Sequence, residues 1–153
     1  MIEEKIKWQE VIEILIWNFM GVGMVWLLST GLSQIIVEKS VGIVVLREES
    51  AIKTFLGSIF CGILMWIATI GTSRVENKVV SPLLTIGCVM AFVLAGFPHS
   101  IADSFYFLAG NGRWDIWLIE VVGNAFGANL IGFLVKDHTS IFMWGILRKN
   151  FWL

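Results

Sequence analysis

Four long apolar stretches constrain the fold of this chain more than any other feature of its sequence. They cover residues 11 to about 36, 51–71, 79–110 and 116–135. A helix needs about 20 apolar residues to cross the hydrocarbon core of a bilayer. Because 57% of the 153 residues are hydrophobic, more than a soluble domain of this size buries, we predict a single all-α integral membrane domain with four transmembrane spans.

The third stretch, residues 79–110, is too long for one straight span. A helix of this length would measure about 48 Å at 1.5 Å per residue, whereas the hydrocarbon core is about 30 Å thick. The stretch contains Gly96 and Pro98, and a proline both removes a backbone donor and clashes with the preceding turn. We therefore predict a break near Gly96–Pro98, where protein or a water-filled cavity covers the freed backbone groups.

The lysines and arginines indicate how the spans are oriented. With four spans, both termini lie on one side together with the turn after the second span, and this side collects seven basic residues against four in the opposite loops. Positive charge favours the cytoplasmic side, so we predict a multi-pass protein of the inner or plasma membrane with both termini in the cytoplasm. The seven are Lys5, Lys7, Arg74, Lys78, Lys136, Arg148 and Lys149, and the four are Lys39, Arg47, Lys53 and Arg113.

The two ends of the chain carry further expectations. The first apolar stretch lacks a small-residue cleavage site, so we expect it to be retained rather than removed as a signal peptide. After residue 135 the sequence is too short to span again, but it mixes phenylalanine and tryptophan with basic residues. This mixture predicts an interfacial helix at about 139–152.

The residues themselves disfavour several classes of function. A formal net charge of −1 and the lack of a basic arm argue against a nucleic-acid partner. Cys61 and Cys88 lack the spacing of a disulfide or metal site and are expected to be small buried hydrophobes. His99 and Asp103 offer two metal ligands at most, and no nucleophile–base pair or phosphate loop is recognisable. We expect no enzyme, no metal and no cofactor.

An N-x-x-G motif occurs in both the first and the last apolar stretch. The first copy runs from Asn18 to Gly21 and the second from Asn124 to Gly127. Small residues at this spacing let helix backbones approach closely, and an asparagine amide can bond across the contact. The motif therefore predicts close helix packing in both places.

Four motifs together resemble one known family. They are IWNFMGVG (16–23), FLGSIFCGILMWIATIG (55–71), MAFVLAGFPHSIADSFYFLAG (90–110) and GNAFG (123–127). Through them, the chain resembles the formate/nitrite transporter family over nearly its whole length. In the third motif, six residues match the pattern A-F-x-x-S-G-F-E-H-x-x-A-N-M in register: Ala91, Phe92, Gly96, Phe97, His99 and Ala102.

The resemblance implies an aquaporin-like fold. Members of this family have six spans in two inverted halves and assemble as pentamers with one pore in each protomer. The four spans here match helices three to six, and the two N-x-x-G motifs then fall on helices three and six, which are mates in the inverted repeat. Helices one and two have no counterpart. The alternatives are a second polypeptide that supplies them, pairing of copies of this chain, loss of conduction, or a fragment of a longer chain.

The resemblance also implies pore residues. It places His99 as the central histidine that protonates or attracts a small monovalent weak-acid anion such as formate, nitrite, lactate or hydrosulfide. It places Phe92 as a constricting ring on the cytoplasmic side, and Phe97 and Asn124 at further pore positions. The alternatives are a His99 that simply bonds a neighbouring helix and a Phe92 that is plain packing.

Departures from the family pattern bear on function. Pro98 stands where the family has glutamate, and Asp103 where it has asparagine. An ionised Asp103 favours the imidazolium form of His99 but cancels the field that attracts anions, whereas a protonated Asp103 can replace the asparagine as a hydrogen-bond partner. The resemblance thus predicts part of a weak-acid anion channel, with a non-conducting membrane assembly or accessory subunit as the alternative.

Two further charged residues belong to the apolar stretches or border them. Glu120 lies early in the last stretch, where we expect it to reach the membrane interface. Arg47 precedes the second stretch, and we expect it to extend to the interface along its aliphatic stem. The alternative for Arg47 is attraction of an anion, because the resembling family carries a lysine nearby.

Overall fold

A computed structural model describes residues 8–135 of the chain, so the helix predicted at 139–152 lies outside the described residues. Residues 8–135 form helices and turns with no strand, which confirms the all-α fold class. A π-helix (η1, Ile67–Gly71) and a 3-10 turn (η2, Thr72–Arg74) continue α3. The α-helices are α1 (Trp8–Leu32), α2 (Gln34–Glu48), α3 (Ala51–Trp66), α4 (Val80–Leu94), α5 (Ser100–Ala109) and α6 (Trp114–Leu134).

Two continuous helices are long and apolar enough to cross a membrane. They are Ala51–Arg74, which joins α3 to its two extensions, and α6, with 24 and 21 residues. Two shorter apolar helical segments, Leu15–Gly31 and Val80–Leu94, lie in α1 and α4. By length and composition, two helices therefore favour membrane association, and the count of four spans stays a prediction.

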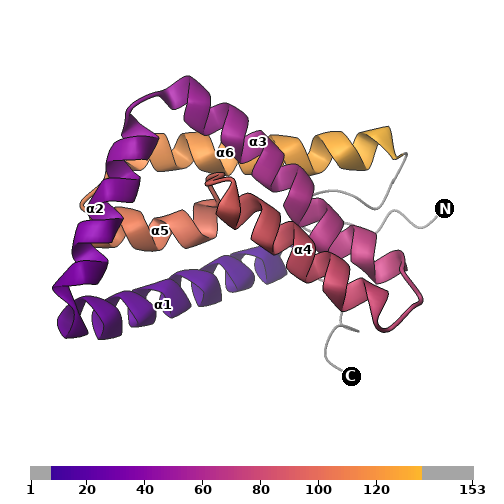
Figure 1. Ribbon diagram of the computed structural model, residues 1–153, viewed down its shortest axis with the longest axis horizontal. Helices are drawn as coiled ribbons and strands as arrows, with labels where there is room; N and C mark the ends of the chain where they lie inside the picture. Colours follow the sequence, from indigo (N-terminus) through magenta and orange to yellow (C-terminus); the bar gives the residue numbers. More distant parts are fainter. Residues whose placement is uncertain (1–7, 136–153) are drawn as a thin grey trace.

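The helices run in two main directions. Figure 1 shows α1, α5 and α6 lying roughly along the long axis and α3 and α4 running obliquely to them, while α2 crosses at one end. The turn between α5 and α6 lies at this end too, where the backbone N–H of Arg113 donates a hydrogen bond to Glu48 Oε1 of α2 at 2.6 Å. The turn between η2 and α4 lies at the opposite end. In Figure 1, α4 and α5 meet between these ends.

The first long helix is shorter than the sequence predicts. Its expected end near residue 36 is corrected to Leu32, because Ser33 adopts an extended backbone, with φ −153° and ψ 118°. The segment expected to be a loop at 37–50 is instead α2. This helix buries Ser40 and Val44, four residues apart, and exposes Glu38 and Lys39. That spacing gives α2 one face against the rest of the protein and one face outward.

Helices α3 and α6 pack backbone against backbone. A Cβ added at Gly62 would collide with the carbonyl group of Asn124, and one at Gly127 with the carbonyl group of Ile59. The second N-x-x-G motif therefore forms the close contact that its small residues predict. The first motif does not, because a Cβ added at Gly21 would meet no atom within 4 Å.

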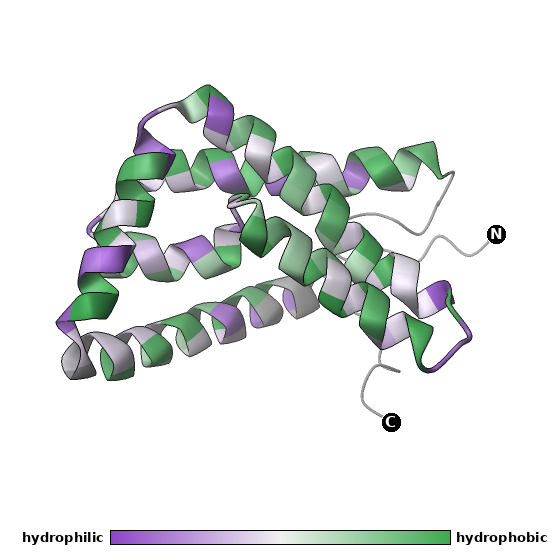
Figure 2. Cartoon of the chain, in the orientation of Figure 1, coloured by the Kyte–Doolittle hydropathy of each residue, from purple (hydrophilic) through white to green (hydrophobic). Residues whose placement is uncertain are grey.

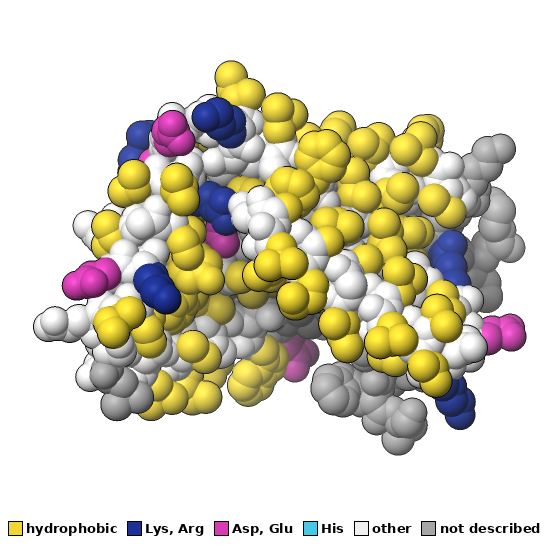
Figure 3. All heavy atoms as spheres, viewed as in Figure 1, with side chains coloured by type: hydrophobic (Ala, Val, Ile, Leu, Met, Phe, Trp, Pro, Cys, Tyr) yellow, Lys and Arg dark blue, Asp and Glu magenta, His cyan; other side chains and the backbone are white. Residues whose placement is uncertain are grey.

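Large apolar side chains cover the outside of the molecule. Ile52, Leu94 and Phe133 are 74%, 78% and 81% exposed. Figure 2 shows hydrophobic residues along α3, α4 and α6, and Figure 3 shows apolar side chains over the middle of this face. Charged side chains gather mainly near α2 and near the turn before α4. A contiguous apolar surface of this extent indicates contact with lipid or with other chains.

Candidate functional site at the helix break

The predicted break is present and contains both Gly96 and Pro98. Helix α4 ends at Leu94 and α5 begins at Ser100. Gly96 has a φ of +67°, a left-handed conformation that glycine adopts without strain. Its N–H donates to the Val93 carbonyl oxygen at 3.1 Å. The prediction of a break near Gly96–Pro98 is confirmed.

Side chains of α2 and α6 bind the backbone groups that the break releases. Arg47 Nη1 donates to the Gly96 carbonyl oxygen at 2.7 Å. Asn124 Nδ2 donates to the Pro98 carbonyl oxygen at 3.0 Å, and Asn124 Oδ1 accepts from the Ser100 N–H at 2.9 Å. In an apolar environment, protein groups must replace the helix hydrogen bonds that a break removes, because no water is present to do so. These contacts supply such groups.

Trp117 also supports the break, although the motifs do not predict it. Its indole Nε1 donates to the Ser100 carbonyl oxygen at 2.7 Å, within the first turn of α5. Trp117 precedes Asn124 by seven residues, so both lie on one face of α6. That seven-residue spacing is the sequence signal that could have identified it.

His99 caps the N-terminus of α5. Its Nδ1 accepts a hydrogen bond from the Ala102 N–H at 3.2 Å, so the ring proton of the neutral imidazole is assigned to Nε2. The His99 ring stacks on Phe92, with centroids 5.3 Å apart and planes at 15°. An imidazolium would lose the capping bond and face the positive end of the helix dipole. The geometry therefore holds two predicted pore residues together and favours a neutral His99.

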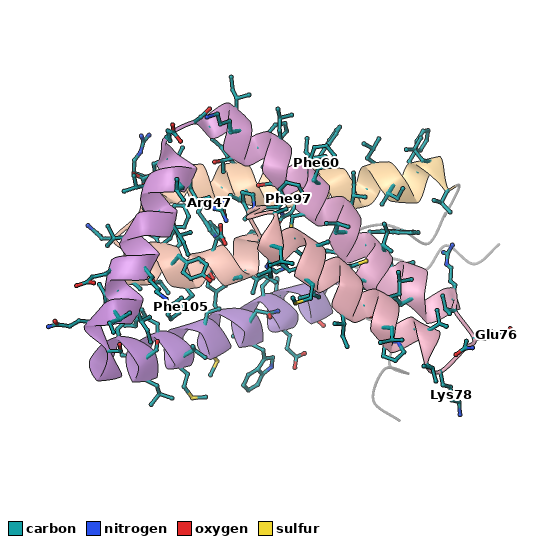
Figure 4. The ribbon with its side chains drawn as sticks, viewed as in Figure 1. Arg47, Phe60, Glu76, Lys78, Phe97 and Phe105 are labelled. Atoms are coloured by element: carbon teal, nitrogen blue, oxygen red, sulfur yellow. The ribbon has the colours of Figure 1, made fainter. Side chains whose placement is uncertain are left out.

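Phe97 lies on the α3 side of the break. Its ring stacks on Phe60 of α3, with centroids 5.6 Å apart and planes at 23°. Figure 4 labels both residues, which lie side by side. Pro98 packs behind Phe97, because a Cβ added at Gly57 would lie 2.9 Å from Pro98 Cδ. Phe97 and Pro98 thus fix the break against α3.

Three charged groups meet beside the break. Arg47 Nε donates to Asp103 Oδ2 at 2.7 Å and lies 3.8 Å from Glu120 Oε1. The Arg47 side chain is 15% exposed, that of Asp103 3% and that of Glu120 0%. Figure 4 labels Arg47 beside α2, from which it extends toward the break.

Two expectations are corrected by this cluster. Glu120 does not reach an interface: it is fully buried, because it shares the packing face of α6 with Gly123, Asn124 and Gly127. Arg47 does not extend outward along the surface, because Asp103 and the free carbonyl of Gly96 draw its guanidinium inward. The signal for Glu120 was its spacing of three and four residues before Gly123 and Asn124.

The described residues bring no metal site together. Among residues 8–135, no group of three or more histidine, cysteine, aspartate or glutamate side chains is placed to hold a metal ion. Cys61 and Cys88 are free thiols, both buried. What the break does offer is an Nε2–H donor on His99, an aromatic ring on Phe92 and a buried ion pair.

Comparisons with known proteins add no family to this description. No family model matches the chain, and neither a curated protein nor a solved structure matches it significantly. The resemblance to the formate/nitrite transporter family therefore rests on the motifs quoted from the sequence. The fold class is established by the helices themselves, and the function is a matter for proposal.

Proposed function

We propose that this chain is a membrane protein that forms part of a channel for small monovalent weak-acid anions, such as formate, nitrite, lactate or hydrosulfide. The observation that carries the proposal is the depth of the helix break. Asn124, which binds the break, lies midway along α6, about 15 Å from either end at 1.5 Å per residue. If α6 crosses the membrane, the break lies at the bilayer centre, where transporters built from discontinuous helices bind their substrates.

The apolar exterior supports a place in the bilayer. Exposed apolar side chains occupy the middle of the molecule in Figure 3, and charged ones lie mainly near two ends. This distribution suits a protein whose middle lies in hydrocarbon and whose ends reach water. We place the protein in the inner or plasma membrane with both termini in the cytoplasm, following the distribution of basic residues.

His99 supplies the chemistry of the proposed site. With Nδ1 occupied by the Ala102 N–H, its Nε2–H is left as a hydrogen-bond donor for an anion. Crossing an apolar passage is costly for a charge and much less so for the neutral acid. The neutral imidazole holds the anion at the break by this hydrogen bond, and the proton that converts the anion to the acid comes from water. The neighbouring Phe92 ring would bar hydrated ions, as apolar constrictions do in channels.

A partner is part of the proposal. The resembling family encloses its pore with two helices that have no counterpart among these 153 residues. We propose a pentamer-like homo- or hetero-oligomer in which a complementary subunit or further copies of the chain supply the missing wall. The exposed apolar residues of α1 and α4, among them Leu27 and Leu94, offer surface for such contacts. No catalytic role or cofactor is proposed.

Uptake of formate or nitrite into proteoliposomes tests the channel. The full chain, alone and with hydrophobic proteins co-expressed from neighbouring genes, is compared with His99→Asn over a range of pH. We expect uptake that rises as the pH falls and drops at least tenfold in His99→Asn. His138→Asn, which removes the other imidazole of the chain, is the control. Uptake that is equal in wild type and His99→Asn would exclude the proposed role of His99.

One observation favours a second function, a non-conducting membrane assembly or accessory subunit. Arg47 is a cation that contacts the break, and Asp103 pairs with it at 2.7 Å. This ion pair neutralises the charge that would otherwise draw an anion inward. Purification as a closed oligomer without anion flux, even with its co-expressed neighbours, would favour this function over the channel.

A further inference from the structure

We propose that Asp103 and Glu120 form a buried carboxyl pair that binds one proton between them, so that the helix break carries a proton-binding site beside Arg47. The site is separate from His99 and its stacked ring. Its ligand is a proton taken from water. The inference does not depend on whether the chain conducts anions.

The first support is the condition of Glu120. Its side chain is 0% exposed, and neither carboxylate oxygen has a hydrogen-bond donor among the described residues. A buried carboxylate without donors is among the costliest arrangements in a protein, and proton binding removes the cost by neutralising the charge. Glu120 is thus an unpartnered polar group directed into the cluster.

The second support is the neighbour that Glu120 meets. Its carboxyl group and that of Asp103 face the same nitrogen, Arg47 Nε. Arg47 Nε is hydrogen-bonded to Asp103 Oδ2 at 2.7 Å, but at 3.8 Å it is too far from Glu120 Oε1 for a hydrogen bond. Two ionised carboxylates would face one guanidinium and leave a buried negative charge uncompensated. With one proton, the Glu120 hydroxyl can donate to Asp103, and the cluster becomes neutral.

The other titratable groups around the pair do not change the net charge of the cluster. His99 lies at the start of α5 near Asp103, and its Nδ1 acts as an acceptor, as in a neutral ring. Cys61 of α3 is a fully buried thiol. Neither brings a second positive charge. Arg47 of α2 is the counter-charge that faces both carboxyls, so a proton is needed to complete the balance.

Arg47 links the proton to the geometry of the break. The same guanidinium that binds Asp103 donates from Nη1 to the Gly96 carbonyl oxygen at 2.7 Å. When the proton leaves, a second carboxylate competes for the guanidinium and weakens its hold on Gly96. Proton binding and the hydrogen bond from Arg47 to the Gly96 carbonyl are therefore coupled, and each favours the other.

Infrared spectroscopy of the full chain in lipid nanodiscs tests the pair directly. A protonated carboxylic acid gives a C=O stretching band that carboxylates lack. We expect this band in the wild type at neutral pH, with its intensity halved or less in both Glu120→Gln and Asp103→Asn. In Glu120→Gln, Asp103 keeps its hydrogen bond from Arg47, and in Asp103→Asn the guanidinium loses its charged partner and is free to pair with Glu120. In either variant one carboxylate has the cation to itself, so we expect it to ionise. Glu76→Gln, on the exposed turn before α4, is the matched control and keeps the band.

Three results would overturn the inference. One is the absence of the band in wild-type protein at neutral pH. Another is a band that survives in Asp103→Asn, because Glu120 would then be protonated by burial alone and the pair would share nothing. The third is a band that survives in Glu120→Gln. Gel filtration and circular dichroism check that each variant is folded, and where one variant fails to fold, the wild-type band and the other variant decide.

Discussion

Asn124 Nδ2 donates a hydrogen bond to the carbonyl oxygen of Pro98 at 3.0 Å. The same nitrogen donates to the Ser58 carbonyl oxygen at 2.8 Å, and Asn124 Oδ1 accepts from the Ser100 N–H at 2.9 Å. One side chain at the midpoint of α6 therefore satisfies backbone groups on α3, within the break and at the start of α5. The break and the contact between α3 and α6 depend on the same amide.

We predict that Asn124→Leu is severely destabilising. The substitution leaves three backbone groups without their side-chain partner, and a buried unsatisfied polar group costs about 1–3 kcal/mol. The total loss should be about 3 kcal/mol or more in the free energy of unfolding, measured by denaturant titration in mixed micelles. Asn129→Leu is the control, because exposed Asn129 bonds the Ala125 carbonyl within its own helix. Equal losses for the two variants would contradict this role of Asn124.

The contact between α3 and α6 makes a prediction for glycine. In Gly127→Ala the added methyl group would collide with the Ile59 carbonyl, so the helices must separate and the protein should lose stability. In Gly87→Ala of α4 the methyl group meets nothing within 4 Å, and alanine is the better helix former by about 1 kcal/mol. Thermal unfolding in detergent should place Gly127→Ala below the wild type and Gly87→Ala level with it or above. A tolerated Gly127→Ala would show that the two helices are not in backbone contact.

The break could be predicted from the sequence because two independent signals coincide there. The stretch 79–110 is too long to cross the bilayer as one straight helix, and it contains Gly96 and Pro98, which interrupt a helix. The contact at Gly127 could be predicted for a similar reason, since small residues recur on one helix face. Both predictions rest on local properties of the chain, namely length, backbone freedom and side-chain size.

The charged cluster could not be predicted in the same way. Arg47, Asp103 and Glu120 come from three different helices, and only the packing of α2, α5 and α6 brings them together. A charge near the end of an apolar stretch usually reaches water, which is why an interfacial position was expected for Arg47 and Glu120. Helix α2 was not predicted either. It is shorter and less apolar than the stretches on either side, so span length and hydrophobicity do not identify it.

Arg47 gives a prediction for the buried ion pair. Arg47→Met removes the cation from Asp103 and the donor from the Gly96 carbonyl, and loss of one partner from a buried pair costs about 3–5 kcal/mol. Adding Asp103→Asn removes the unpaired charge, so the double variant should recover part of the loss. The exposed pair of Arg113 and Asp115 is the control, because Arg113→Met should change stability little. A double-mutant cycle by denaturant titration measures the coupling, and strictly additive losses would contradict the pairing.

Two substitutions at His99 test its role as the N-terminal cap of α5. Asparagine is a good N-cap residue, so His99→Asn should keep the start of α5, whereas His99→Leu removes the acceptor for the Ala102 N–H and costs about 1 kcal/mol. Both variants lose the stacking on Phe92, so the difference between them isolates the cap. Denaturant titration should therefore rank His99→Asn above His99→Leu in stability.

The same cap predicts a pH dependence of stability. Protonation of His99 Nδ1 breaks the capping bond in the wild type, whereas the cap in His99→Asn does not titrate. The stability advantage of the wild type over His99→Leu should therefore shrink as the pH falls, and an advantage that stays constant in acid would show that Nδ1 is not the capping acceptor.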